Sequence, residues 1–110
     1  MKEGLMREPT FLILTSSAGR AQHGYAIMTD VGRISQGRVR LRAGTLYAAL
    51  DRLRCDGLIE TDHEEVVDAR LRRYYRITDE GRRQLEAEVA RLRANAAVAA
   101  RRLGLAAGAP

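Results

Sequence analysis

The chain has 110 residues, which is the size of one compact domain and excludes most two-domain enzymes. Hydrophobic residues make up 45% of it, but 17 are Ala and only 28 are Val, Ile, Leu, Met or Phe, so the core is thin and a second subunit would stabilise it. The net charge is +5 and 18 of the 19 basic residues are Arg, whose planar guanidinium suits phosphate groups and guanine edges, although GC-rich coding also enriches Arg and Ala.

The first predicted elements are two helices and a strand. One helix runs over about residues 9–18, with Pro in its first turn and Gly19 as a left-handed stop. The second runs over about residues 22–31 and is closed by Gly32. Residues 38–42 then alternate basic and apolar side chains, which predicts a short half-buried strand with three arginines on its exposed face.

A third helix and a hairpin follow. The helix is predicted over residues 43–55, with a buried leucine stripe and with Gly57 as its stop. Residues 58–62 and 71–78 are strand-like and are joined by a loop over residues 63–70, so they form a β-wing. Period-two alternation puts Leu71, Tyr75 and Ile77 on the inner face of the second strand, and Arg70, Arg72, Tyr74 and Arg76 on the outer face.

The last predicted helix, residues 79–103, carries the clearest periodicity. Thr78 caps it, and Asp79 and Glu80 suit the positive end of its dipole. Spacings of four and three run for nearly three heptads, which is typical of packing against another helix. We interpret this stripe as a dimer interface, the alternative being packing onto the first helix of the same chain; its residues are Leu85, Val89, Leu92, Ala96, Ala99 and Leu103.

Charge is distributed unevenly along the chain. Residues 20–54 have a net charge of +5 and residues 69–83 have +4, whereas residues 55–68 have −6 and no basic residue. Two basic segments around an acidic one indicate a nucleic-acid face that leaves out one acidic loop.

The element order predicts a mainly α fold with a small β-wing, a winged helix-turn-helix followed by a C-terminal dimerisation helix. The expected divisions are residues 1–78 for the DNA-binding domain, 79–103 for the dimerisation helix and 104–110 for a flexible tail. In such a fold the third helix enters the major groove of DNA while the wing reaches the adjacent backbone.

Several short runs carry a resemblance to a known family. They are His23-Gly24-Tyr25, Gly44-Thr45-Leu46-Tyr47-Ala48-Ala49-Leu50, Arg52-Leu53, Gly57-Leu58-Ile59 and Arg73-Tyr74-Tyr75-Arg76-Ile77-Thr78, with Glu80-Gly81. In order and spacing they resemble the PadR family of transcriptional regulators over about residues 5–103, and the single short C-terminal helix resembles the small subfamily. The resemblance implies a homodimeric DNA-binding regulator, usually a repressor, that recognises a dyad operator and releases it on binding a small molecule.

The predicted DNA-contacting residues come from three segments. At the start of the third helix, Gly44 and Thr45 let donors approach a phosphate, and Tyr47 lies at the protein–DNA boundary. The full set is Arg38, Arg40, Arg42, Gly44, Thr45, Tyr47, Arg52, Arg72, Tyr74 and Arg76. Each has a structural alternative: a Tyr47 ring half-buried against the wing, an ion pair of Arg52 with Asp51 or Asp56, and charged side chains that are solvated or protect a sheet edge.

Other functions and ligands were weighed against this interpretation. The chain lacks a phosphate-cradling glycine motif and a nucleophile elbow, so we expect no enzyme. No His or Cys pair has metal-ligand spacing, so we expect no metal or cofactor. A hydrophobic aromatic ligand between two subunits remains an alternative to plain core for Phe11, Leu14, Met28, Val89 and Leu92. The rival function is a winged-helix module that binds a protein partner without specific DNA binding.

The expected compartment follows from what the sequence lacks. No apolar run approaches the length of a membrane span, and the first residues show no export signal. The single cysteine, Cys55, permits no internal disulfide. We therefore expect a cytoplasmic protein without a membrane partner.

Overall fold

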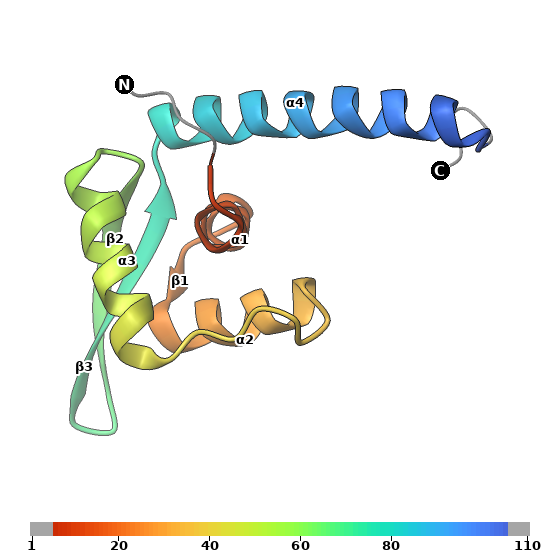
Figure 1. The fold of residues 1–110 in the computed structure, drawn as a ribbon. Coiled ribbons are helices and arrows are strands. Elements are labelled where there is room, and N and C mark those ends of the chain that lie inside the picture. Colours follow the sequence, from red (N-terminus) through yellow and green to blue (C-terminus); the bar gives the residue numbers. More distant parts are fainter. Residues whose placement is uncertain (1–5, 106–110) are drawn as a thin grey trace.

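A computed structural model describes residues 6–105 (Figure 1). The elements in chain order are α1 (Glu8–Ala18), β1 (Gln22–His23), α2 (Gly24–Ile34), α3 (Ala43–Cys55), β2 (Ile59–Val67), β3 (Arg70–Ile77) and α4 (Asp79–Leu103). The predicted mainly α fold with a small β-wing is confirmed, as is the extent of α3. Of the predicted tail, residues 106–110 lie outside the described part of the chain.

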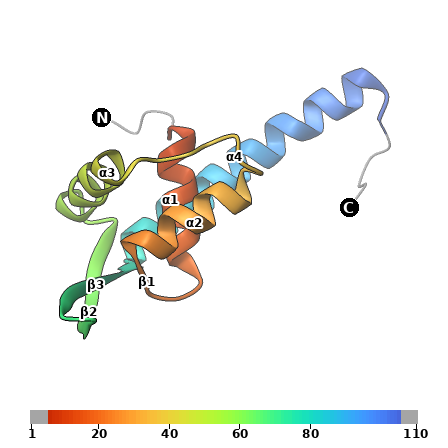
Figure 2. The ribbon, with the colours of Figure 1, turned by 90° about the horizontal axis from the view of Figure 1, so that it is seen from below.

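The core lies where α1, α2, α3 and the base of the sheet meet. Figures 1 and 2 show α1 passing between α4 on one side and α2 on the other, while the far half of α4 projects beyond the other elements. The buried apolar residues are Leu12, Ile13, Leu14, Ile27, Val31, Leu46, Ala49, Leu50, Leu53, Leu58, Ile59, Tyr75 and Ile77. They include the leucine stripe predicted for α3, so this core fixes α3 in place and leaves its opposite face to solvent.

Local chemistry sets the start of α4. The Thr78 hydroxyl accepts a hydrogen bond from the Gly81 N–H at 3.0 Å, which is the predicted N-cap. The same hydroxyl donates to the carbonyl of Gly57 at 2.6 Å, and the Thr78 N–H donates to Leu58 O at 3.0 Å. The cap therefore also joins α4 to the turn between α3 and β2.

The three strands form one antiparallel sheet in the order β1-β3-β2. Gln22 and His23 pair with Tyr75 and Tyr74 on one edge of β3, and β2 occupies the other edge. The predicted start of the second helix at residue 22 is therefore wrong. Residues 22 and 23 are extended, and α2 begins at Gly24.

The strand predicted for residues 38–42 is wrong, because this segment is a loop. The alternation of basic and apolar residues does correspond to an extended chain. Val39 and Leu41 are half-buried, whereas Arg38, Arg40 and Arg42 are exposed. A strand also needs a partner strand, and residues 38–42 pair with none of β1, β3 and β2, which make up the sheet. The Ser35 hydroxyl accepts the Val39 N–H at 3.0 Å instead.

The wing is longer than the sequence indicates and its loop is shorter. Residues 63–67 and Arg70 belong to strands, so the predicted eight-residue loop is a two-residue turn at Asp68 and Ala69. Both turn residues have positive φ, 53° and 65°, which matches the right-handed twist of a hairpin. The acidic segment is thus strand β2, paired with the basic strand β3.

Three smaller predictions are also wrong. Gly19 has right-handed helical angles, so it is not a left-handed stop. Gly32 lies inside α2, which continues to Ile34. Leu71 is 62% exposed although Tyr75 and Ile77 are buried, because the tip of the wing extends beyond the core.

Candidate nucleic-acid interface

The exposed face of α3 carries the predicted contact residues of that helix. Gly44, Thr45, Tyr47 and Arg52 are exposed, whereas the leucines are buried. No side chain caps the helix and its first turn holds no acidic residue. The N-terminal end of α3 is therefore suited to an anion.

Tyr47 is held by a close approach to α2. A Cβ added at Gly24 would lie 2.4 Å from the Tyr47 hydroxyl oxygen, so the ring occupies space that only glycine leaves open. The Tyr47 side chain is nevertheless 50% exposed. The predicted alternative, a ring half-buried against the wing, thus needs a correction: the ring packs against Gly24 of α2 and lines a groove shared with the wing.

The three arginines of the loop before α3 have different surroundings. Arg38 binds the carboxylate of Glu8 through both terminal nitrogens, one at 2.8 Å, and this pair lowers the pKa of Glu8. The Arg40 Nε donates to the Gly37 carbonyl at 3.1 Å. Arg42 is exposed at the N-cap of α3. Arg40 and Arg42 therefore keep their charge available beside α3, whereas Arg38 shares its charge with α1.

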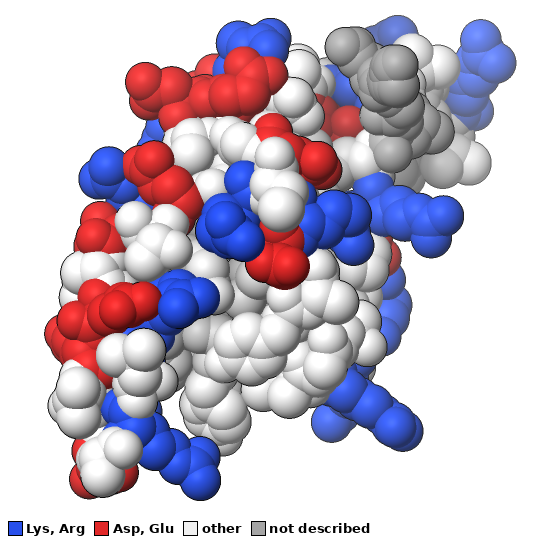
Figure 3. All heavy atoms as spheres, turned by 90° about the vertical axis from the view of Figure 1, so that its left-hand side faces the viewer, with Lys and Arg blue, Asp and Glu red and all other residues white. Residues whose placement is uncertain are grey.

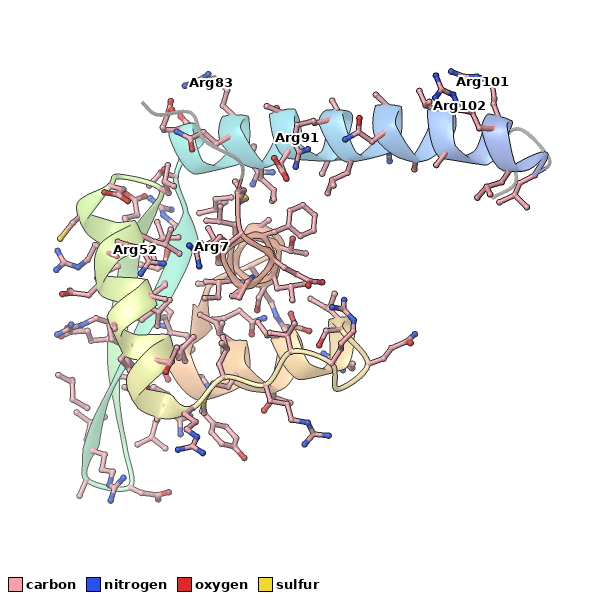
Figure 4. All side chains as sticks on the ribbon, viewed as in Figure 1. Arg7, Arg52, Arg83, Arg91, Arg101 and Arg102 are labelled. Atoms are coloured by element: carbon pink, nitrogen blue, oxygen red, sulfur yellow. The ribbon has the colours of Figure 1, made fainter. Side chains whose placement is uncertain are left out.

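Arg52 lies on the side of α3 that faces α1. Figure 4 shows it close to Arg7, and both line an otherwise largely apolar groove of about 610 Å³ between the two helices. The alternative ion pair with Asp51 is absent within residues 6–105, because Asp51 binds Arg54 at 2.8 Å. Sequence reasoning missed Arg7, since nothing in the sequence relates the start of α1 to α3.

Acidic residues of β2 neutralise part of the wing. Arg76 Nε binds Glu60 at 2.7 Å and its Nη1 lies 3.6 Å from Asp62, while Arg73 binds Glu64 at 2.9 Å. Figure 3 views the outer face of α3 and the wing, where acidic side chains gather mainly on the left and in the upper part, and basic ones mainly on the right. On the outer face predicted to be basic, Arg76 is thus neutralised by β2, whereas Arg70 and Arg72 form no ion pair within residues 6–105.

Tyr74 is the centre of a polar cluster at the middle of the wing. Its hydroxyl donates to Glu65 at 3.1 Å, its ring stacks on His63 at 4.3 Å, and His23 meets it edge-on at 5.2 Å. The Asp62 carboxylate hydrogen-bonds to His63 and raises the pKa of that imidazole. Burial lowers the pKa of His23, whose Nδ1 accepts the Ala26 N–H. Tyr74 therefore already has an intramolecular partner.

The helix stripe predicted as a dimer interface divides into two parts. Leu85 and Val89 are half-buried, and Leu85 packs against the core. Leu92 is 42% exposed and Leu103 is 73% exposed. Ala96 and Ala99 between them are also exposed. The alternative of packing onto the same chain thus applies to the first turns of α4 only.

The remaining features limit other kinds of site. Arg83, Arg91, Arg101 and Arg102 lie along α4, away from α3 (Figure 4). Among residues 6–105, no group of three or more His, Cys, Asp or Glu side chains is arranged to hold a metal ion. Within the same range, no helix has both the length and the apolar character that crossing a membrane requires.

The arrangement of helices, sheet and wing is shared with known proteins. The model of the transcriptional regulator PadR-like family matches residues 13–87. The transcriptional regulator Rv3488 of Mycobacterium tuberculosis is 40% identical over 73 residues, which are 66% of this chain and 64% of that protein. The chain thus spans less than two thirds of this relative.

Solved structures agree with the family model. A PadR family transcription regulator from Clostridium difficile R20291 is 25% identical, with a TM-score of 0.72 over 88% of this chain and 99% of that one. Bacillus subtilis PadR in complex with operator DNA shares the fold at 19% identity, with a TM-score of 0.67 over 76% of this chain and 47% of that one. The chain therefore belongs to the PadR-like family of transcriptional regulators and has the winged-helix fold of that family.

Proposed function

We propose that this chain is a homodimeric repressor that binds a dyad-symmetric operator through α3 and the wing. The observation that carries the proposal is the division of α3, which buries its leucines and exposes Thr45 and Tyr47 beside Arg40 and Arg42. The likeness of the fold to Bacillus subtilis PadR, solved in complex with operator DNA, supports it. Arginine and tyrosine donors next to a helix that fits the major groove are the chemistry of such an interface.

The proposed contact residues differ in whether they already bind a carboxylate of the same chain. Gly44 and Thr45 bind a phosphate at the start of α3, and Tyr47 contacts the backbone or a thymine methyl group. Arg40, Arg42, Arg52 and Arg72 supply positive charge. Arg38, Tyr74 and Arg76 also belong to the proposed set, but each must first leave an intramolecular carboxylate.

The direct test compares specific with non-specific binding. The protein is titrated against the duplex upstream of its own coding sequence and against a scrambled duplex of equal length and composition. We expect tighter binding to the first and a protected inverted repeat whose half-site centres lie about 10 base pairs apart. Equal affinity for both duplexes, together with a stable complex with another protein, would instead favour the interaction module.

A variant pair tests the role of α3. Tyr47→Ala is expected to lower operator affinity while sedimentation shows an unchanged assembly, because half of the ring is exposed and contributes little to the core. Arg93→Gln, an exposed site on α4, is the control and leaves binding unchanged. Unchanged operator binding by Tyr47→Ala removes this residue from the interface.

The dimer is proposed to form through α4. The stripe of Leu85, Val89, Leu92, Ala96, Ala99 and Leu103 ends in exposed leucines, which a second copy would cover. Sedimentation velocity at micromolar concentration is expected to show a dimer. Leu92→Glu and Leu103→Glu are expected to give monomers with an unchanged circular dichroism spectrum, because neither side chain is buried in one copy. A monomeric native chain contradicts the proposal.

Release by a small hydrophobic ligand is the last part of the proposal. Phe11 and Met28 are half-buried and pack against the edge of the core, so they could form part of a wall for such a ligand. Leu14 is fully buried and is a core residue. A thermal-shift screen of phenolic and cationic aromatic compounds is expected to find a stabilising compound that also weakens operator binding. A screen without any shift contradicts ligand control.

A further inference from the structure

A groove of about 700 Å³ separates the tip of the wing from the N-terminal ends of α2 and α3. Tyr25 and Tyr47 line it from the helices, and Arg70 and Arg72 line it from β3. Tyr25 is 68% exposed, although a tyrosine this close to the core is ordinarily more buried. All four side chains can donate hydrogen bonds, and guanidinium groups in particular match the geometry of phosphate oxygens.

The arginines of β3 fall into two groups. Arg73 and Arg76 bind carboxylates of β2. Within residues 6–105, neither Arg70 nor Arg72 forms an ion pair, and both line the groove. The charge of the groove is therefore not cancelled by β2, in contrast to the charge on the rest of the wing.

The register of the hairpin explains the difference. Arg70 stands opposite Val67, which offers no carboxylate. Arg72 stands opposite Glu65, but the carboxylate of Glu65 is engaged by the Tyr74 hydroxyl at 3.1 Å and by His63 Nε2 at 3.4 Å. Arg73 also lines the groove, but its charge is paired with Glu64. Asp68 adds one negative charge, so Arg70 and Arg72, which form no ion pair within residues 6–105, leave one net positive charge there. This charge suits a single phosphate rather than several.

We propose that this groove seats one phosphate group of the duplex DNA backbone, with Tyr25 and Arg70 as contact residues in addition to Tyr47 and Arg72. Arg73 stays in its ion pair with Glu64, and Arg76 lies outside this groove in its ion pair with Glu60. This assignment rests on the proposed DNA-binding function. It places a phosphate contact near the tip of the wing, where Arg70 and Arg72 are free of ion pairs within residues 6–105.

Salt dependence tests the assignment without knowledge of the operator. The full chain is titrated by fluorescence anisotropy against a short labelled duplex of mixed sequence, between about 50 and 200 mM salt. Arg70→Gln is expected to make the slope of log affinity against log salt shallower by roughly 0.9 for each protomer on the duplex. Arg93→Gln, which removes the same charge at an exposed site of α4, is the matched control and is expected to leave the slope unchanged.

Tyr25→Phe tests the neutral donor in the same assay. Loss of its hydroxyl is expected to weaken binding roughly two- to tenfold without a change in slope, because no charge is removed. Inorganic phosphate, added at constant ionic strength, is expected not to compete. Competition by inorganic phosphate would show a site for a free anion and would overturn the assignment to DNA.

Different results would contradict the DNA-binding function and the assignment of the groove. A native chain that binds no duplex contradicts the DNA-binding function itself. If the native chain binds but Arg70→Gln keeps the native slope, or Arg93→Gln changes the slope as much as Arg70→Gln, the groove is not the phosphate seat. All three altered side chains are at the surface, and equal melting temperatures would confirm that each variant is folded.

Discussion

The Tyr47 hydroxyl lies against the Cα of Gly24, so that a Cβ on residue 24 would be 2.4 Å from the hydroxyl oxygen. Gly24 does not have a positive φ, and the requirement for glycine is one of space. The contact joins the first residue of α2 to the exposed face of α3. It thereby fixes the direction of a side chain that we propose as a DNA contact.

Gly24→Ala is expected to displace the Tyr47 ring and to weaken DNA binding in the anisotropy assay. Because the ring is half-exposed and can swing outward, the free energy of unfolding should change little. Gly32→Ala is the matched control in the same helix, since a Cβ there meets nothing within 4 Å, and it should stabilise the protein by about 0.5–1 kcal/mol. Full DNA affinity in Gly24→Ala would contradict a positioning role for Gly24.

Gly81→Ala is expected to destabilise the protein by about 1–3 kcal/mol. A Cβ at this position would lie 2.0 Å from the backbone carbonyl oxygen of Leu58 and 2.8 Å from a side-chain carbon of Ile77, so α4 would have to move away from β2. Urea unfolding measures the loss. Gly44→Ala, with nothing within 4 Å of the added Cβ, is the control; an equal loss in both variants would show that the contact with Leu58 is not the cause.

Ala69→Gly is expected to stabilise the wing by about 1 kcal/mol. Ala69 has a φ of 65°, which costs an L-residue with a Cβ energy that glycine does not incur. Thermal unfolding should show a higher midpoint. Ala90→Gly, on the exposed face of α4, should lower the midpoint because glycine disfavours a helix. A lower midpoint in Ala69→Gly would show that the added flexibility of the unfolded chain costs more stability than removing the strain of the positive φ gains.

Two histidines give stability opposite dependences on pH. The hydrogen bond to Asp62 raises the pKa of His63 above 6.5, so its contribution is complete below that pH and is lost as pH rises through the raised value. Burial and the charge of Arg72 lower the pKa of His23, so its contribution is present above 6.5 and is lost as pH falls through the lowered value.

Variants separate these two effects. Urea midpoints measured from about pH 5 to pH 8 should no longer fall on the alkaline side in His63→Gln, because the group that prefers its protonated form is gone. In His23→Asn, which retains an N-cap side chain for α2, the urea midpoints should no longer fall on the acidic side. An unchanged profile in either variant would show that this pH dependence comes from a group other than the substituted histidine.

Helices with a strong local signal could be predicted from the sequence. The leucine spacing of α3 and the Thr78 cap of α4 depend on neighbouring residues only, and both are as predicted. The failures come from long-range pairing. Nothing near residues 38–42 reveals that this segment pairs with no strand of the sheet, and nothing near Asp68 reveals that an Asp-Ala pair adopts the tight turn of a hairpin.

The sequence by itself determined the family resemblance, the winged-helix order and the exposed face of α3, because helical period and capping are local properties of the chain. Only the tertiary structure decided which charges are available. The hairpin register sets Glu60 and Glu64 against Arg76 and Arg73 and leaves Arg70 unpaired. Charge in a sequence is a count, whereas its availability depends on distances between residues that only folding brings together.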